Sequence, residues 1–148
     1  MQIEVKIKRV RENAVIPEYA TDGSAALDLR CAETEPVVLK AHARAAIPTG
    51  IAIAPADRSV AAIVCARSGL AAKSGIALAN GIGVIDSDYR GEILVSVINN
   101  SDKDYEIQPG ERIAQLMFVP VYTARLTECS ELDKTARGAG GFGSTGKN

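Results

Sequence analysis

Short apolar stretches, each closed by turn-forming residues, constrain the fold of this chain more than any other feature. Val, Ile, Gly and Pro recur in nearly every segment, and Gly and Pro are the strongest interrupters of regular structure. Asn80-Gly81 lies between two apolar runs and predicts a type I′ hairpin, because that turn needs a positive φ at both central positions. The whole pattern predicts about a dozen short strands, as in a β-sandwich or jelly roll.

The expected strands follow the apolar runs, and the first alternates apolar and charged side chains as a half-buried strand does. We expect strands over residues 2–10, 26–30, 37–40, 48–53, 60–65, 76–79, 82–85, 92–99 and 112–119. One helical segment is expected over residues 68–73, with Ser68 as its N-cap and Ser74-Gly75 as its end. The predicted fold class is therefore all-β: a jelly-roll-like β-sandwich with one short helix.

The charge balance excludes one broad class of partner. The net charge is -1 at pH 7 and the pI is about 5.9. Proteins that bind nucleic acid regardless of sequence normally carry a basic face, so we expect no nucleic-acid partner. A small anionic ligand needs only a local cluster of cations and is compatible with this charge.

The cysteines and the chain start indicate the compartment. Cys31, Cys65 and Cys129 are odd in number and widely spaced, so we interpret them as reduced packing residues of a cytosolic protein. A zinc site from these and His42 is not expected, because zinc ligands come in closely spaced pairs. The sequence shows no signal peptide and no membrane-spanning apolar run, so we expect a cytoplasmic protein without a membrane partner.

The C-terminal segment differs in character from the rest. We expect a β body over residues 1–132 and a flexible glycine-rich arm over residues 133–148, where Phe142 is the only large apolar side chain. The arm matches two phosphate-loop patterns by letter, but both require a strand before and a helix after the glycines, and here neither context is present.

The arm nevertheless has the chemistry of a phosphate clamp. Glycines allow backbone N–H groups to close on an anion. Arg137 supplies a planar charged fork and Ser144 and Thr145 supply hydroxyls. Phe142 suits stacking on a flat ring, so we interpret the arm as a segment that orders over a bound ligand.

Three further stretches combine polar groups with turns. Arg67-Ser68 stands where an apolar strand gives way to the short helix, which is either an anion site or a common helix cap. Asp86 and Tyr89 follow the Asn80-Gly81 turn, and form either a polar turn or a base-reading edge with a water-activating carboxylate. Arg112 and Gln115 interrupt an otherwise apolar strand, and a buried Gln115 needs polar partners or a ligand there.

Taken in order, five stretches resemble the motifs of the trimeric deoxyuridine triphosphatases, the dUTPases. They are residues 23–29, 67–71, 80–91, 110–115 and 137–146. Two departures are minor: Ala66 stands where the family often has proline, and Leu27 stands where many members have tyrosine. The resemblance implies a jelly-roll subunit, a homotrimer with active sites shared between subunits, and hydrolysis of dUTP to dUMP and pyrophosphate. That reaction keeps uracil out of DNA and supplies dUMP for thymidylate synthesis.

The resemblance also implies a role for each site residue. Asp86 is the catalytic general base that activates the water attacking the α-phosphate. Asn80 and nearby backbone groups read uracil, Tyr89 lies under the deoxyribose, and Phe142 stacks on the base. The full substrate-binding set is Arg67, Ser68, Gly69, Asn80, Gly83, Val84, Ile85, Asp86, Tyr89, Leu94, Gln115, Arg137, Phe142, Gly143, Ser144 and Thr145.

The implied cofactor is Mg²⁺, carried mainly on the triphosphate through waters, with Asp28 contacting a metal-bound water. Two alternatives have other activities. A dCTP deaminase shares the fold but needs an acid placed to work on the exocyclic amine of the base. A non-catalytic β module would bind nucleotide as a sensor, and Asp86 argues against it.

Overall fold

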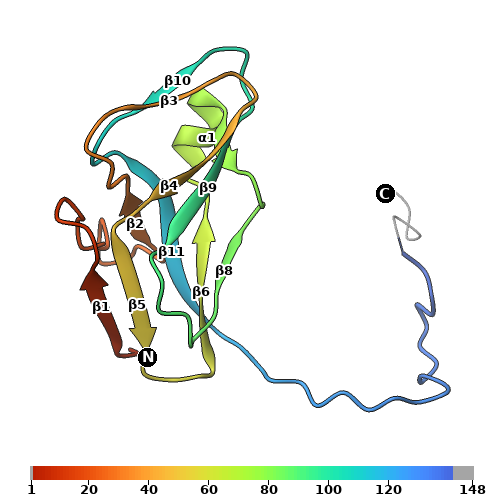
Figure 1. Ribbon diagram of the computed structural model, residues 1–148. Coiled ribbons are helices and arrows are strands. Elements are labelled where there is room, and N and C mark those ends of the chain that lie inside the picture. Colours follow the sequence, from red (N-terminus) through yellow and green to blue (C-terminus); the bar gives the residue numbers. More distant parts are fainter. Residues whose placement is uncertain (1, 142–148) are drawn as a thin grey trace.

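The computed structural model confirms the all-β fold class (Figure 1). It describes residues 2–141, so Met1 and residues 142–148 lie outside the described residues. The elements are β1 (Val5–Arg9), β2 (Leu27–Arg30), β3 (Val37–Leu39), β4 (Arg44–Pro48), β5 (Ile51–Pro55), β6 (Val60–Cys65), α1 (Ser68–Ser74), β7 (Ile76–Leu78), β8 (Gly83–Ile85), β9 (Leu94–Asn99), β10 (Tyr105–Ile107) and β11 (Arg112–Pro120).

The strands form a jelly-roll-like sandwich in which neighbours in space are rarely neighbours in sequence. A four-stranded sheet has the order β2-β11-β6-β8, and a three-stranded sheet has the order β4-β9-β7. Two further pairs, β1-β5 and β10-β3, complete the body, and every pairing is antiparallel. Strand β11 therefore pairs with β2 on one side and with β6 on the other.

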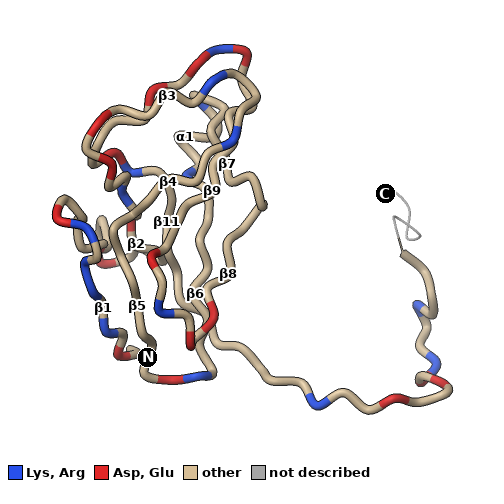
Figure 2. Tube along the Cα trace, viewed as in Figure 1, with Lys and Arg blue, Asp and Glu red and all other residues tan. Residues whose placement is uncertain are grey.

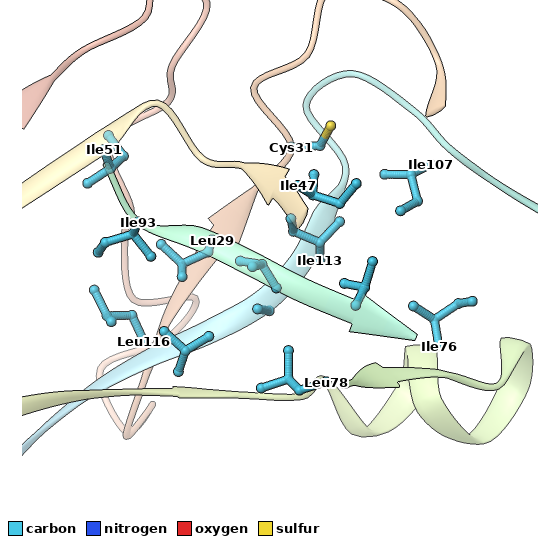
Figure 3. Packing of buried hydrophobic residues seen from close by; sticks show 14 of the residues in the cluster. Leu29, Cys31, Ile47, Ile51, Ile76, Leu78, Ile93, Ile107, Ile113 and Leu116 are labelled. Atoms are coloured by element: carbon cyan, nitrogen blue, oxygen red, sulfur yellow. The ribbon is translucent and has the colours of Figure 1, made fainter. Parts of the chain in front are cut away.

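The core lies between the sheets and consists of branched aliphatic side chains (Figure 3). Strand β9 shows the two-residue period clearly, because Val95, Val97 and Asn99 are buried and the residues between them are less so. The inward residues that are almost fully buried include Leu29, Ile47, Ile51, Ile76, Ile93, Val95, Val97, Ile107 and Leu116.

The outward face of the four-stranded sheet is polar at one end. Asp28 of β2 lies opposite Gln115 of β11, and Gln115 lies opposite Cys65 of β6. Directly opposed residues of antiparallel strands project to the same face. These three side chains therefore form a row that points away from the core.

Strand β6 and helix α1 agree closely with the sequence predictions, except at the helix start. The helix ends at Gly75, whose φ of 71° lies in the left-handed region that glycine tolerates. The prediction that Ser68 caps the helix is wrong, because Arg67 occupies the N-cap position and Ser68 is already helical. No side chain closes the N-cap hydrogen bond.

The predicted strand over residues 48–53 is wrong in its limits. Strand β4 ends at Pro48, and the chain turns at Thr49-Gly50 before β5 begins, with Gly50 at a φ of 69°. The sequence did not predict β4, since its two central alanines carry little strand preference. Strand β10 was also missed.

The predicted type I′ hairpin at Asn80-Gly81 is also wrong. Strand β7 pairs with β9, whereas β8 pairs with β6, so the two runs belong to different sheets. Gly81 has a φ of 74°, but His42 is the only non-glycine residue with a positive φ within residues 2–141. Asn80-Gly81 therefore carries the chain from one sheet to the other.

The chain leaves the body after β11. Val121 donates a backbone hydrogen bond to Ser59, and residues 122–141 form no strand or helix and lead away from the sandwich (Figure 1). The predicted division at residues 132 and 133 stays a prediction, although the last strand already ends at Pro120.

The cysteines and charges agree with most of what the composition indicates. All three cysteines are free, and Cys31 is buried in the core, but Cys129 is exposed and is not a packing residue. Acidic and basic residues are interspersed over the body, apart from basic strand β1 (Figure 2). No helix within residues 2–141 is long and apolar enough to cross a membrane.

Candidate functional site

A carboxylate shared by two arginines stands at the polar end of the outward sheet face. Asp28 Oδ1 accepts a hydrogen bond from Arg67 Nε, and Asp28 Oδ2 accepts one from Arg112 Nη1, each at 3.1 Å. Arg67 Nη1 also donates to the Arg112 backbone oxygen at 3.2 Å. Three separate segments, β2, the loop before α1, and β11, therefore meet at Asp28.

The two arginines outnumber the single carboxylate that they bind, so this cluster has a net positive charge. The Asp28 side chain is 12% exposed, whereas Arg67 and Arg112 are 26% and 44% exposed. A guanidinium has five N–H donors, so both arginines keep donors for another anion after binding Asp28. The cluster therefore holds two arginines in a fixed orientation, and each has more N–H donors than its contacts with Asp28 use.

The start of helix α1 adds neutral donors beside Arg67. Ser68 and Gly69 are exposed, and no atom lies within 4 Å of where a Cβ on Gly69 would stand. The Ser68 hydroxyl and nearby backbone amides are thus open to a ligand next to the arginine pair. Gln115 joins the same surface, because it lies opposite Asp28 and is partly exposed.

The turn before β11 is held by its own polar contacts. Tyr105 donates a hydrogen bond to Glu111, and the backbone N–H of Gln108 donates to the same carboxylate at 2.9 Å. Arg30 Nη1 donates to the Gly110 oxygen at 2.9 Å. Burial, followed by the Glu111 contact, raises the pKa of Tyr105 to about 12. These contacts fix the point at which Arg112 enters the sheet.

A second polar region follows β8. Asp86 is exposed, and its backbone oxygen accepts a hydrogen bond from the Tyr89 N–H at 3.1 Å, which closes a turn. Tyr89 donates its hydroxyl to the Glu92 backbone oxygen at 3.0 Å. Exposed apolar side chains surround this turn, with Val84 60% and Leu94 52% exposed. Asp86 thus presents an exposed carboxylate in the same turn as a tyrosine whose hydroxyl is fixed.

Asn80, which lies between β7 and β8, and Gly83, the first residue of β8, lie at the end of β8 away from Asp86. Asn80 is exposed, and its Nδ2 lies 3.8 Å from where a Cβ on Gly83 would stand. The same Cβ would lie 3.1 Å from Val64 Cβ, so glycine lets β8 approach β6 closely. Asn80, Gly83 and Ile85 therefore line one short edge of the sheet.

The two regions lie at opposite ends of β6. Ile85 pairs with Ala62, so Asp86 follows beside Ala61, whereas Arg67 comes two residues after the other end of the strand. Figure 1 shows α1 at the upper end of β6 and the loop after β8 at its lower end. Six residues of extended chain correspond to roughly 20 Å. Within one chain, Asp86 and Arg67 therefore stand too far apart to contact one phosphate group.

The structure thus brings part of the predicted site together. Asp28, Arg67 and Gln115 meet, with Ser68 and Gly69 beside them, while Asp86 and Tyr89 form a separate group. The predictions for Phe142, Gly143, Ser144 and Thr145 lie outside the described residues. Arg137 is described, and its Nε donates to the Gly140 oxygen at 2.9 Å within the arm.

Arg112 is the site residue that the sequence predictions missed. Together with Gln115 it interrupts the apolar strand within residues 110–115, but that signal indicates no partner and no role in the site. Its partner Asp28 is 84 positions away, so only the pairing of β2 with β11 shows the contact.

Metal binding was also predicted near Asp28. Within residues 2–141, no cluster of three or more His, Cys, Asp or Glu side chains is placed to hold a metal ion. The Asp28 carboxylate has lone pairs beyond those that face the two arginines. It therefore fits a hydrogen bond from a metal-bound water better than direct coordination.

The fold and this cluster define a jelly-roll-like β protein with two arginines oriented by one carboxylate at one end of its main sheet. The chain belongs to the dUTPase family, whose sequence profile matches residues 12–146.

Three known proteins illustrate the similarity. The deoxyuridine 5'-triphosphate nucleotidohydrolase of Desulfitobacterium hafniense (strain DSM 10664 / DCB-2) is 49% identical, and the match covers 97% of each chain. A mutant dUTPase of Staphylococcus bacteriophage 80alpha, solved with dUpNHpp, is 27% identical with a TM-score of 0.88, covering 97% of this chain and 98% of that one. A mutant dUTPase from phage phi11 of S. aureus, described with a structural Mg(II) ion, is 24% identical with a TM-score of 0.80. It covers 88% of this chain and 99% of that one, and shows the fold alone.

Proposed function

We propose that this chain hydrolyses dUTP to dUMP and pyrophosphate by attack of water on the α-phosphate. The observation that carries the proposal is the exposed carboxylate of Asp86, in the same turn as the anchored Tyr89, on a chain that also holds Arg67 and Arg112 around Asp28. Family membership and relatives named for this reaction support it. The reaction keeps uracil out of DNA and supplies dUMP for thymidylate synthesis.

Asp86 acts as the general base. Its carboxylate takes a proton from water as the oxygen attacks phosphorus, and pyrophosphate leaves with the electrons of the broken P–O bond. Displacement at a triphosphate needs alignment and charge neutralisation rather than a protein nucleophile. One carboxylate is therefore enough for the chemical step.

The phosphates bind at the arginine cluster. Arg67 donates from its fork, Ser68 and Gly69 donate from the hydroxyl and the backbone, and Gln115 assists. Arg112, which the sequence predictions left without a role, contributes positive charge from the other side of Asp28. In the arm, Arg137 with Ser144 and Thr145 clamps the γ-phosphate.

The base and sugar bind at the β8 region. Asn80 and the backbone of residues 83–85 read the uracil edge, while Val84 and Leu94 supply apolar contact. Cytosine presents the wrong donor pattern, and a 2′-hydroxyl collides with the ring of Tyr89. Phe142 stacks on the base when the arm closes.

Mg²⁺ is the proposed cofactor, bound through the triphosphate and its waters. Bound there, it neutralises phosphate charge. This chain contributes Asp28, which accepts a hydrogen bond from a metal-bound water while it continues to orient Arg67.

We further propose a homotrimer, working in the cytoplasm, whose active sites combine groups from different subunits. The roughly 20 Å of strand between Asp86 and Arg67 supports this proposal. The general base Asp86 and the proposed phosphate-binding residue Arg67 of one chain cannot reach the same phosphate group. A second copy brings its own Arg67 to the Asp86 of the first. The chain that follows Pro120 then carries the arm to a neighbouring subunit.

A pyrophosphate-release assay over the deoxynucleoside triphosphates, with and without Mg²⁺, tests the proposal. We expect turnover of dUTP alone and a requirement for Mg²⁺. Release of ammonia with formation of dUTP from dCTP, followed in a parallel assay, would show a deaminase, and tight binding of dUTP without turnover would show a sensor module. Asp86→Asn should abolish turnover while preserving binding of a non-hydrolysable analogue, and retained activity would refute the base assignment.

A further inference from the structure

The ring of Tyr89 is held at its hydroxyl end by two neighbouring backbone groups. Its hydroxyl donates to the Glu92 backbone oxygen at 3.0 Å. A Cβ built on Gly91 would lie 2.3 Å from Tyr89 Oη and 2.6 Å from Cζ, so the ring lies directly against the Gly91 backbone. The residue is still 43% exposed. One side of the ring therefore faces solvent while its position is set by residues 91 and 92.

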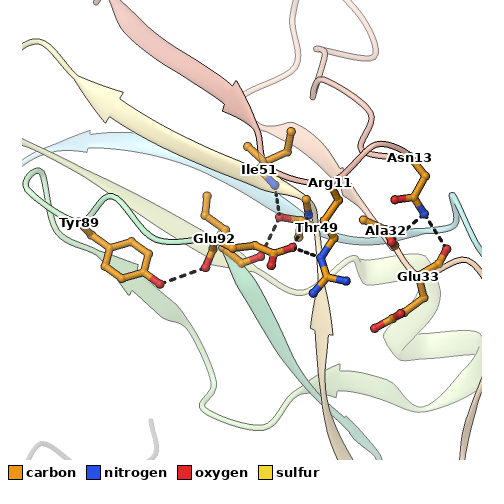
Figure 4. A network of polar contacts seen from close by, with 10 residues as sticks. Arg11, Asn13, Ala32, Glu33, Thr49, Ile51, Tyr89 and Glu92 are labelled. Atoms are coloured by element: carbon orange, nitrogen blue, oxygen red, sulfur yellow. Dashed lines mark hydrogen bonds and ion pairs between the residues drawn. The ribbon is translucent and has the colours of Figure 1, made fainter.

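Glu92 is itself held by its side chain. Its Oε1 accepts a hydrogen bond from Arg11 Nε at 2.7 Å and one from the Gly50 backbone N–H at 2.8 Å. The Glu92 side chain is 20% exposed. Figure 4 shows Glu92 between Arg11 on one side and Tyr89 on the other. Glu92 thus contacts Tyr89 through its backbone oxygen and Arg11, in the loop after β1, through its side chain.

The turn at residues 49–51 anchors the backbone next to Glu92. Thr49 Oγ1 donates to the Ile93 oxygen at 2.7 Å, and the Ile93 N–H donates to the Ile51 oxygen at 2.8 Å. The Val10 N–H donates to the Gly50 oxygen at 2.8 Å, which fastens the loop carrying Arg11 to the same turn. The backbone oxygen that receives the Tyr89 hydroxyl is therefore fixed from two directions.

We propose that Glu92, held by Arg11, is a positioning residue that fixes the Tyr89 ring and thereby sets discrimination between deoxyribose and ribose. This inference rests on the proposed function, in which Tyr89 lies under the sugar. A 2′-hydroxyl differs from hydrogen by one oxygen atom, so a wall that excludes it must hold its place closely. The Arg11–Glu92 pair supplies that rigidity from a segment that does not touch substrate.

The test compares kcat/KM for dUTP and UTP in Glu92→Gln and Arg11→Met. Glutamine keeps an acceptor for the Gly50 N–H but loses the ion pair, and Arg11 lies at the surface, so both variants should fold. Loss of one hydrogen-bonded contact should lower the dUTP-to-UTP ratio roughly three- to tenfold. Tyr89→Phe should lower the ratio similarly, and adding Glu92→Gln to it should lower the ratio no further.

Asp104→Asn is the matched control, because it breaks another ion pair, with Lys40 at 2.7 Å. This pair takes no part in the hydrogen bonds that join Tyr89, Glu92 and Arg11. The control variant should leave the ratio unchanged. An unchanged ratio in Glu92→Gln and Arg11→Met, with or without a lower melting temperature, would overturn the inference. Equal losses for dUTP and UTP would overturn it too. Absence of dUTP turnover in the wild-type chain would instead overturn the proposed function.

Discussion

Arg67 Nε donates a hydrogen bond to Asp28 Oδ1 at 3.1 Å, and the other oxygen of this carboxylate holds Arg112. Asp28 is the least exposed of the three side chains, so it serves as the fixed centre around which the arginines are oriented. In the proposed function, Asp28 therefore orients the phosphate-binding arginines in addition to contacting a metal-bound water.

Asp28→Asn should lower kcat/KM for dUTP roughly 10- to 150-fold, because a hydrogen bond between charged groups is worth roughly 1.5–3 kcal/mol. The loss should appear mainly as a higher KM, because the proposed contacts between the arginines and the phosphates form in the ground state as well as in the transition state. Steady-state kinetics at saturating Mg²⁺ measures it, with Asp104→Asn as the control. A change only in the Mg²⁺ concentration needed for half-maximal rate would mean that Asp28 serves the metal alone.

Gly91→Ala should displace Tyr89, because the new Cβ would lie 2.3 Å from the tyrosine oxygen. Selectivity for dUTP over UTP should then fall, while the β body stays folded. Gly23→Ala adds the same methyl group where nothing lies within 4 Å, and should have little effect. Kinetics with both nucleotides, together with thermal melts, checks this prediction. Unchanged selectivity in Gly91→Ala would show that the ring position is unimportant.

Stability should fall between about pH 10 and pH 12 because of Tyr105. Burial and the hydrogen bond to Glu111 raise its pKa from 10.0 to about 12 in the folded chain. Above pH 10 the unfolded chain loses the phenolic proton while the folded chain keeps it, so rising pH favours unfolding. The stabilising contribution is complete below pH 10 and is lost as pH rises through the folded pKa.

Urea denaturation at pH 9 and pH 11 measures this effect. Tyr105→Phe removes the titrating group, so its free energy of unfolding should fall less between the two pH values than that of the wild-type chain. Equal losses in both proteins would show that the Tyr105–Glu111 contact does not couple folding to pH.

The sequence predicted best those features that depend on neighbours along the chain. Strand β6 has the predicted limits because an apolar run is bounded by polar residues, and helix α1 ends where Gly75 adopts a left-handed conformation. The fold class followed from many such local signals, each of which marks a short strand or a turn.

Features that depend on distant partners were less predictable. Asn80-Gly81 has the sequence of a hairpin turn. Strand β7 nevertheless pairs with β9 and strand β8 with β6, and both partners are longer strands. The Asp28–Arg112 and Arg11–Glu92 contacts each join residues more than 80 positions apart. No periodicity or spacing in the sequence reports such pairs, so the orientation of the arginines and of Tyr89 required the structure.

The shared active site is the central claim, and mixed assemblies of two inactive variants test it most directly. Asp86→Asn lacks the base and Arg67→Met lacks the phosphate contact, so each variant alone should be inactive. Co-expressed in equal amounts, random trimers should recover about a quarter of wild-type pyrophosphate release, because about three quarters of them contain one intact site in three. Native mass spectrometry confirms mixing. Mixed trimers without recovered activity would show that Asp86 and Arg67 of the same chain serve one site, and would contradict the account.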